Sequence, residues 1–241
     1  MLTVLTLIAV TLFLSWIGWT LWRIFSERAA LDVEGFIGSQ IKYQTCFFLV
    51  AAVLSGLVYY HSPQSSVFAL GSLTAPVASG WVIGDGWSWV ELGLCSLLLF
   101  SIATIFLCAA SFRGISNWSS FLRKYVLLIV LFAAINALSE ELIYRGMLVS
   151  TVQQQLSPFT TAILSAILFA LAHVRGQARG VTVIAGSAVV GFVLGLSAVQ
   201  TGGLFWAWCI HFAQDVIIFA AFIASFTQAK QAFYAADNRL S

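Results

Sequence analysis

The sequence predicts an all-α fold, a polytopic bundle of transmembrane helices. Hydrophobic residues make up 61% of the 241 residues and charged residues only 8%, far from the composition of a soluble domain. The apolar residues are grouped into runs of about 18 or more, long enough to cross a bilayer as helices. The basic residues gather between those runs. These observations predict a single integral-membrane domain over residues 1–241, with several spans embedded in the lipid bilayer.

About seven spans are expected, in the order 2–22, 43–60, 91–112, 125–148, 158–173, 181–200 and 205–226. The first run has no basic region before it and no small-residue cleavage site, so it predicts a retained span rather than a signal peptide. The stretch 67–90 is also apolar, but four glycines and Pro76 are among the residues that interrupt it. We expect a loop or re-entrant hairpin there, and an eighth span is the alternative.

The distribution of charge supports seven spans. Ten of the eleven Lys and Arg residues lie in the segments 23–42, 113–124, 174–180 and 227–241. With 67–90 not crossing, these four segments share one side, which the positive-inside rule makes cytoplasmic. The N-terminus is then outside and the C-terminus inside. The expected location is an integral, multi-pass position in a membrane, which is the plasma (inner) membrane if the source is bacterial. A net charge of +2 without a basic run gives no indication of nucleic-acid binding.

Two carboxylates and an arginine interrupt the fourth run, at Glu140, Glu141 and Arg145. A charged residue at mid-bilayer costs roughly 2.5–3.5 kcal/mol, so such residues normally face the bundle interior and mark a functional site. Glu141 and Arg145 are four residues apart and can form an ion pair on one helix face. Glu140 points about 100° away, on the face of Asn136 and Tyr144. A buried ion-pair cluster that locks helices together is the structural alternative.

Two later runs also carry ionisable groups. His173 follows Phe169 by four residues near the end of the fifth run, where a lone histidine is more often a packing residue. His211 and Asp215 are four residues apart in the last run, so the carboxylate can orient the imidazole. Such a pair also occurs as a polar contact between helices. Three motifs in this order on three separate spans favour a catalytic site over independent packing.

The motifs Glu-Glu-x-x-x-Arg, Phe-x-x-x-His and His-x-x-x-Asp resemble those of the CAAX protease and bacteriocin-processing (CPBP, or Abi) family of intramembrane proteases. The resemblance covers 125–226, the expected catalytic core, and residues 1–120 contribute spans without an assigned role. It implies that Glu140 and His173 hold and deprotonate the attacking water, and that His211 and Asp215 form the oxyanion hole. It also implies supporting roles for the three residues Glu141, Arg145 and Phe169.

Two features of the chain bear on these implied roles. The prenyl endopeptidases of the family have asparagine where this chain has Asp215, and an ionised aspartate would repel an oxyanion. We therefore expect Asp215 to be protonated or to act by keeping His211 cationic. The spans also place His173 nearer the inner side than Glu140. The two meet only if the span 158–173 starts deep, is tilted or is broken, and Pro158 favours a displaced start.

The expected function is hydrolysis of a peptide bond in a membrane-associated substrate, prenylated or of the leader-peptide type. A metal-independent glutamate mechanism is favoured, because the chain has no His-Glu-x-x-His helix and a ligating glutamate could not activate water. The alternative mechanism is that of a zinc metalloendopeptidase with Glu140, His173, His211 and Asp215 as ligands. The intramembrane ionisable residues would also suit a proton-coupled transporter or a non-catalytic membrane scaffold. A transporter would favour inverted repeats, which the sequence does not show.

Overall fold

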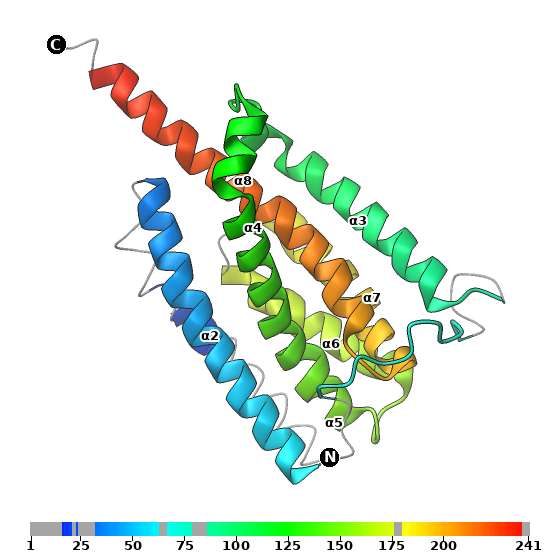
Figure 1. The fold of residues 1–241 in the computed structure, drawn as a ribbon. Coiled ribbons are helices and arrows are strands. Elements are labelled where there is room, and N and C mark those ends of the chain that lie inside the picture. Colours follow the sequence, from blue (N-terminus) through cyan, green and yellow to red (C-terminus); the bar gives the residue numbers. More distant parts are fainter. Residues whose placement is uncertain are drawn as a thin grey trace.

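The computed structural model describes residues 16–20, 23, 32–62, 67–78, 86–175 and 180–237 (Figure 1). These residues form a bundle of α-helices, and their only β-type pairing is an isolated bridge between Pro76 and Ser88. The long helices are α2 (Val33–His61), α3 (Trp89–Phe112), α4 (Trp118–Glu141), α6 (Pro158–Ala172), α7 (Val181–Thr201) and α8 (Phe205–Asp237). The predicted all-α fold is confirmed for the described part of the chain.

Five described helical stretches are long and apolar enough to span a membrane. They are Val33–His61, Trp89–Phe112, Trp118–Val152, Val181–Thr201 and Phe205–Gln228. They make the chain an integral, multi-pass membrane protein. The predicted span 158–173 forms the shorter helix α6, whose 15 residues rise about 22 Å. Most of the predicted span 2–22 lies outside the described residues.

Capping residues explain why two helices begin earlier than the apolar runs. α2 starts ten residues before the predicted 43, because the Asp32 side chain accepts a hydrogen bond from the Gly35 N–H at 2.8 Å. α4 starts at Trp118 rather than near 125, because the Asn117 side chain accepts from the Ser120 N–H at 2.9 Å. Both helices therefore extend past their apolar run on the side of the basic segments.

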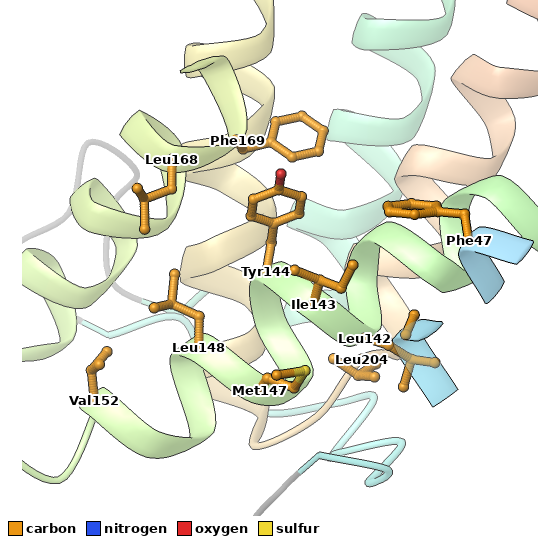
Figure 2. Close-up of a cluster of buried hydrophobic side chains, with 11 residues drawn as sticks. Phe47, Leu142, Ile143, Tyr144, Met147, Leu148, Val152, Leu168, Phe169 and Leu204 are labelled. Atoms are coloured by element: carbon orange, nitrogen blue, oxygen red, sulfur yellow. The ribbon is translucent and has the colours of Figure 1, made fainter. Parts of the chain in front are cut away.

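Helix α4 continues without a break into a π-helix, η1 (Leu142–Val149), and the short helix α5 (Ser150–Val152). All eight residues of η1 are buried. Figure 2 shows that its side chains pack against α6, with the Tyr144 ring 5.3 Å from the Phe169 ring in an edge-to-face contact. π-Helical turns inside α-helices are rare and often occur at functional sites. Here the π-helix contains Arg145 and directly follows Glu140 and Glu141.

The described residues of the stretch 67–90 contain no helix before Trp89, so the prediction that it does not span is confirmed for 67–78 and 86–88. Residues 67–78 pack on the connection between α7 and α8. The N–H groups of Leu204 and Phe205 donate to the carbonyls of Ala69 and Leu70, at 2.8 and 3.1 Å. Gly71, with φ +82°, lies so close that a Cβ would be 2.7 Å from the Gly203 nitrogen. This segment closes the end of the bundle opposite the basic segments.

Small residues bring α6 and α7 close together. A Cβ added to Gly191 would lie 3.0 Å from a Phe169 ring carbon, and one added to Gly195 would lie 3.2 Å from Ala162 Cα. Glycines at such spacing allow close approach of membrane helices. The close approach places the Gly191 carbonyl within reach of η1.

Candidate active site

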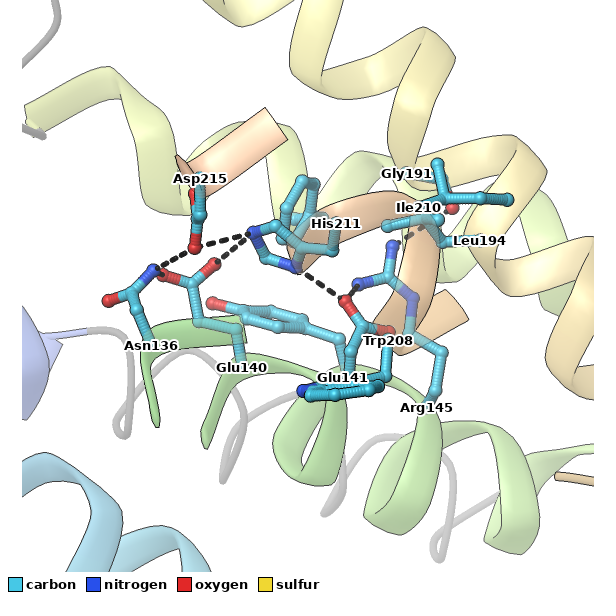
Figure 3. Close-up of polar contacts among 12 residues, drawn as sticks. Asn136, Glu140, Glu141, Arg145, Gly191, Leu194, Trp208, Ile210, His211 and Asp215 are labelled. Atoms are coloured by element: carbon cyan, nitrogen blue, oxygen red, sulfur yellow. Dashed lines mark hydrogen bonds and ion pairs between the residues drawn. The ribbon is translucent and has the colours of Figure 1, made fainter. Parts of the chain in front are cut away.

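The ionisable residues of α4 and η1 form a buried network. Arg145 Nη1 donates to Glu141 Oε1 at 2.9 Å, and both side chains are 0% exposed (Figure 3). Arg145 Nη2 donates to the Gly191 carbonyl of α7 at 3.0 Å. The ion pair predicted from the spacing is therefore present. The Gly191 carbonyl, which no sequence motif indicates, ties this ion pair to α7.

His211 of α8 lies among three carboxylates. Its Nδ1 is 2.8 Å from Glu141 Oε1, the same oxygen that Arg145 holds. Because a carboxylate oxygen accepts, this bond places a proton on Nδ1 and directs Nε2 toward the other two carboxylates. Nε2 lies 3.6 Å from Asp215 Oδ2 and 3.9 Å from Glu140 Oε2. The predicted pairing of His211 with Asp215 on one helix face is observed.

Asn136 joins the two carboxylates that face His211 Nε2. Its Nδ2 donates to Glu140 Oε1 at 3.2 Å and to Asp215 Oδ2 at 3.0 Å (Figure 3). The predicted sharing of a face by Asn136 and Glu140 is thus observed. The second bond crosses to α8, and its partner could not be read from the sequence.

The Phe169 ring lies close to a side chain from each of the three motifs. Its ring is 5.5 Å from the His211 ring and 4.6 Å from the His173 ring, and the Arg145 guanidinium carbon is 4.5 Å from its centroid. His173 Nδ1 is 2.8 Å from the Phe169 carbonyl, its only hydrogen bond within the described residues. Because a carbonyl accepts, Nδ1 carries the proton and Nε2 is left as an acceptor. No hydrogen bond joins His173 to Glu140 in the described part of the chain.

A cavity of about 680 Å³ brings the four predicted catalytic residues to one surface, since Glu140, His173, His211 and Asp215 all line it. His173, which directly follows α6, lines the cavity with the other three despite the depth difference predicted between the spans. The lining also includes Gln40 and Tyr43 of α2, which the sequence motifs did not indicate. Neither residue belongs to a motif, and only helix packing brings α2 to the site.

The cavity extends from the carboxylates toward the side of the basic segments. Its lining reaches Cys108 near the end of α3, Thr182 at the start of α7 and Phe222 in α8. These positions approach the segments 113–124, 174–180 and 227–241, which are predicted to be cytoplasmic. The ionisable cluster lies at one end of the cavity, and most of the remaining lining residues are apolar.

The zinc site considered from the sequence uses side chains that already make hydrogen bonds. Among the described residues, no three His, Cys, Asp or Glu side chains form a group that could hold a metal ion. Two of the zinc ligands considered from the sequence, Glu140 and Asp215, each have one oxygen held by Asn136, and His173 Nδ1 is held by a carbonyl. These hydrogen bonds leave Glu140 Oε2 and His173 Nε2 without a hydrogen-bond partner among the described residues.

Comparison with known proteins identifies the segment that carries this network. Residues 122–217 match the family model described as type II CAAX prenyl endopeptidase, Rce1-like. The matched segment contains Glu140, His173, His211 and Asp215, and it agrees with the resemblance seen over 125–226. No curated protein and no solved structure matches the chain. The family match indicates an intramembrane CAAX-type protease in general, with a membrane-associated peptide substrate. Residues 122–217 are therefore similar to the Rce1-like CAAX prenyl endopeptidases of the CPBP family.

Proposed function

We propose that the chain is an intramembrane endopeptidase in which Glu140 and His173 activate water and His211 and Asp215 stabilise the oxyanion. The substrate is a prenylated or leader-type peptide bound in the cavity. One observation carries the proposal: side chains from three separate helices, α4, α6 and α8, and from the turn after α6 meet at the wall of one cavity.

Glu140 has the geometry of a general base. Its Oε1 accepts from Asn136, whereas its Oε2 is buried and has no hydrogen-bond partner among the described residues. A free carboxylate oxygen beside a cavity can accept a proton from water as the water oxygen bonds to the scissile carbonyl carbon. The proton then passes to the leaving nitrogen as the C–N bond breaks. His173, in the turn after α6, holds the water with Nε2 as an acceptor.

His211 and Asp215 serve the developing negative charge. With Nδ1 fixed by Glu141, protonated His211 presents Nε2–H toward the cavity, where it can donate to an oxyanion. Asp215 Oδ2 accepts from Asn136 and lies 3.6 Å from that imidazole nitrogen. These contacts support the second of the two expectations for Asp215, in which it keeps His211 cationic and oriented. Glu141 and Arg145 hold the imidazole from the other side.

The test is cleavage of a panel of prenylated, acylated and membrane-tethered peptides by purified protein in detergent. Glu140→Gln and His173→Ala should each lower kcat by about 100-fold or more, because each removes a group that handles the proton. Ser197→Ala is the matched control, since among the described residues its buried hydroxyl bonds only to the Leu194 carbonyl of its own helix. Each sample is assayed with and without a chelator.

The glutamate mechanism is supported if both variants lose cleavage while wild type and Ser197→Ala tolerate the chelator. Loss of wild-type cleavage in chelator, restored by zinc, would contradict the metal-independent part of the proposal. Folded wild type that cuts no peptide, or variants that cut as fast as wild type, would contradict the protease mechanism. A transporter or a scaffold would then be favoured.

A further inference from the structure

We propose that Asn136 is a positioning residue that joins the Glu140 and Asp215 carboxylates and selects which oxygen of Glu140 acts as the base. The inference rests on the proposed function. It is carried by the two hydrogen bonds of Asn136 Nδ2, 3.2 Å to Glu140 Oε1 and 3.0 Å to Asp215 Oδ2. Asn136 also lines the cavity beside both carboxylates.

The chemistry of this position requires two donors without a charge. Glu140 on α4 and Asp215 on α8 both lie within 4 Å of His211 Nε2, so their negative charges are close together in a membrane interior. Like charges repel strongly where the dielectric is low. A primary amide nitrogen has two N–H groups and can give one to each carboxylate. An aspartate or an aliphatic residue at 136 has no such pair of donors.

The bridge has a consequence for Glu140. With Oε1 held by Asn136, the carboxylate plane is fixed, and Oε2 is the oxygen without a hydrogen-bond partner among the described residues. Oε2 is also the oxygen that lies 3.9 Å from His211 Nε2. Without the amide, the Glu140 side chain is free to rotate toward the imidazole and pair with it. The Glu140 carboxylate would then be neutralised by the imidazolium and could not act as a base toward water.

A purely structural role would make Asn136 a polar contact that holds α4 to α8. That role predicts a loss of stability and an unchanged turnover rate in the protein that remains folded. A positioning role predicts a lower kcat with KM nearly unchanged, because the interaction serves the reacting groups rather than substrate binding. The two roles therefore differ in a measurable way.

The experiment compares wild type with Asn136→Ala and with Asn136→Asp, which keeps the side-chain shape and removes both donors. We expect kcat to fall about 10- to 100-fold in each, with KM within about threefold, since small misplacements of a reacting group cost up to about 100-fold. Ser139→Ala is the control from the same helix, because within the described part of the chain its hydroxyl bonds only to the Ile135 carbonyl. Values of kcat within about twofold of wild type in both variants would overturn the proposal.

A second measurement needs no activity, so failure of the proposed function is distinguishable from failure of this inference. Asn136→Ala, Asp215→Ala and the double variant are unfolded in mixed micelles of detergent and sodium dodecyl sulfate. If the two residues are bridged, the shifts of the unfolding midpoint should be clearly non-additive. Additive shifts would show that no bridge exists, whether or not wild type cuts a peptide.

Discussion

Replacement of Arg145 by methionine should strongly destabilise the bundle. Methionine keeps the length and the apolar stem of the side chain but removes the charge that neutralises Glu141. The Glu141 side chain is 0% exposed, so its carboxylate would stay buried with His211 as its only charged partner among the described residues. Breaking a buried ion pair in this way costs about 3–5 kcal/mol. The Gly191 carbonyl also loses its donor, and a lost hydrogen bond costs about 1 kcal/mol.

Reversible unfolding in mixed micelles measures the free energy of unfolding of wild type and variant. The double variant Glu141→Gln with Arg145→Met tests the mechanism, because it removes the unpaired charge while an amide oxygen can still accept from His211. We expect the double variant to be less destabilised than the sum of the single variants by about 0.5–3 kcal/mol. The reasoning would be refuted by equal free energies of unfolding for wild type and Arg145→Met. It would also be refuted by a double variant whose destabilisation equals the sum of the two single variants.

Two further predictions concern the closed end of the bundle and the cavity wall. Gly71→Ala should lower stability by about 1–3 kcal/mol in the same unfolding assay, because its φ is +82° and a Cβ would lie 2.7 Å from the Gly203 nitrogen. Gly56→Ala should be neutral or stabilising, because its Cβ would meet no described atom within 4 Å beyond its own helix backbone and chain neighbours. An equal loss in both variants would contradict this account. A bulky thiol label on Cys108, which lines the cavity, should inhibit cleavage, whereas a label on the exposed Cys95 should not. The test uses two variants, one that keeps only Cys108 and one that keeps only Cys95. Equal cleavage by both after complete labelling would show that the far part of the cavity does not hold substrate.

The helical class and the candidate catalytic residues could be predicted because both depend on local patterns. A bilayer leaves no water for the backbone, so a long apolar run predicts a helix almost regardless of its neighbours. Charged residues within such runs stand out for the same reason. The four-residue spacing of a helix alone predicts three of the contacts, which are Glu141 with Arg145, Asn136 with Glu140 and His211 with Asp215.

Only the tertiary structure decided how these pairs combine. The contacts of Glu141 with His211 and of Asn136 with Asp215 join residues 70 and 79 positions apart, so they depend on how α4 and α8 are rotated against each other. The Gly191 carbonyl that holds Arg145 comes from α7, which packs closely against α6. Helix spacing determines which residues share a face, but helix packing determines what that face meets. That packing leaves Glu140 Oε2 without a hydrogen-bond partner among the described residues.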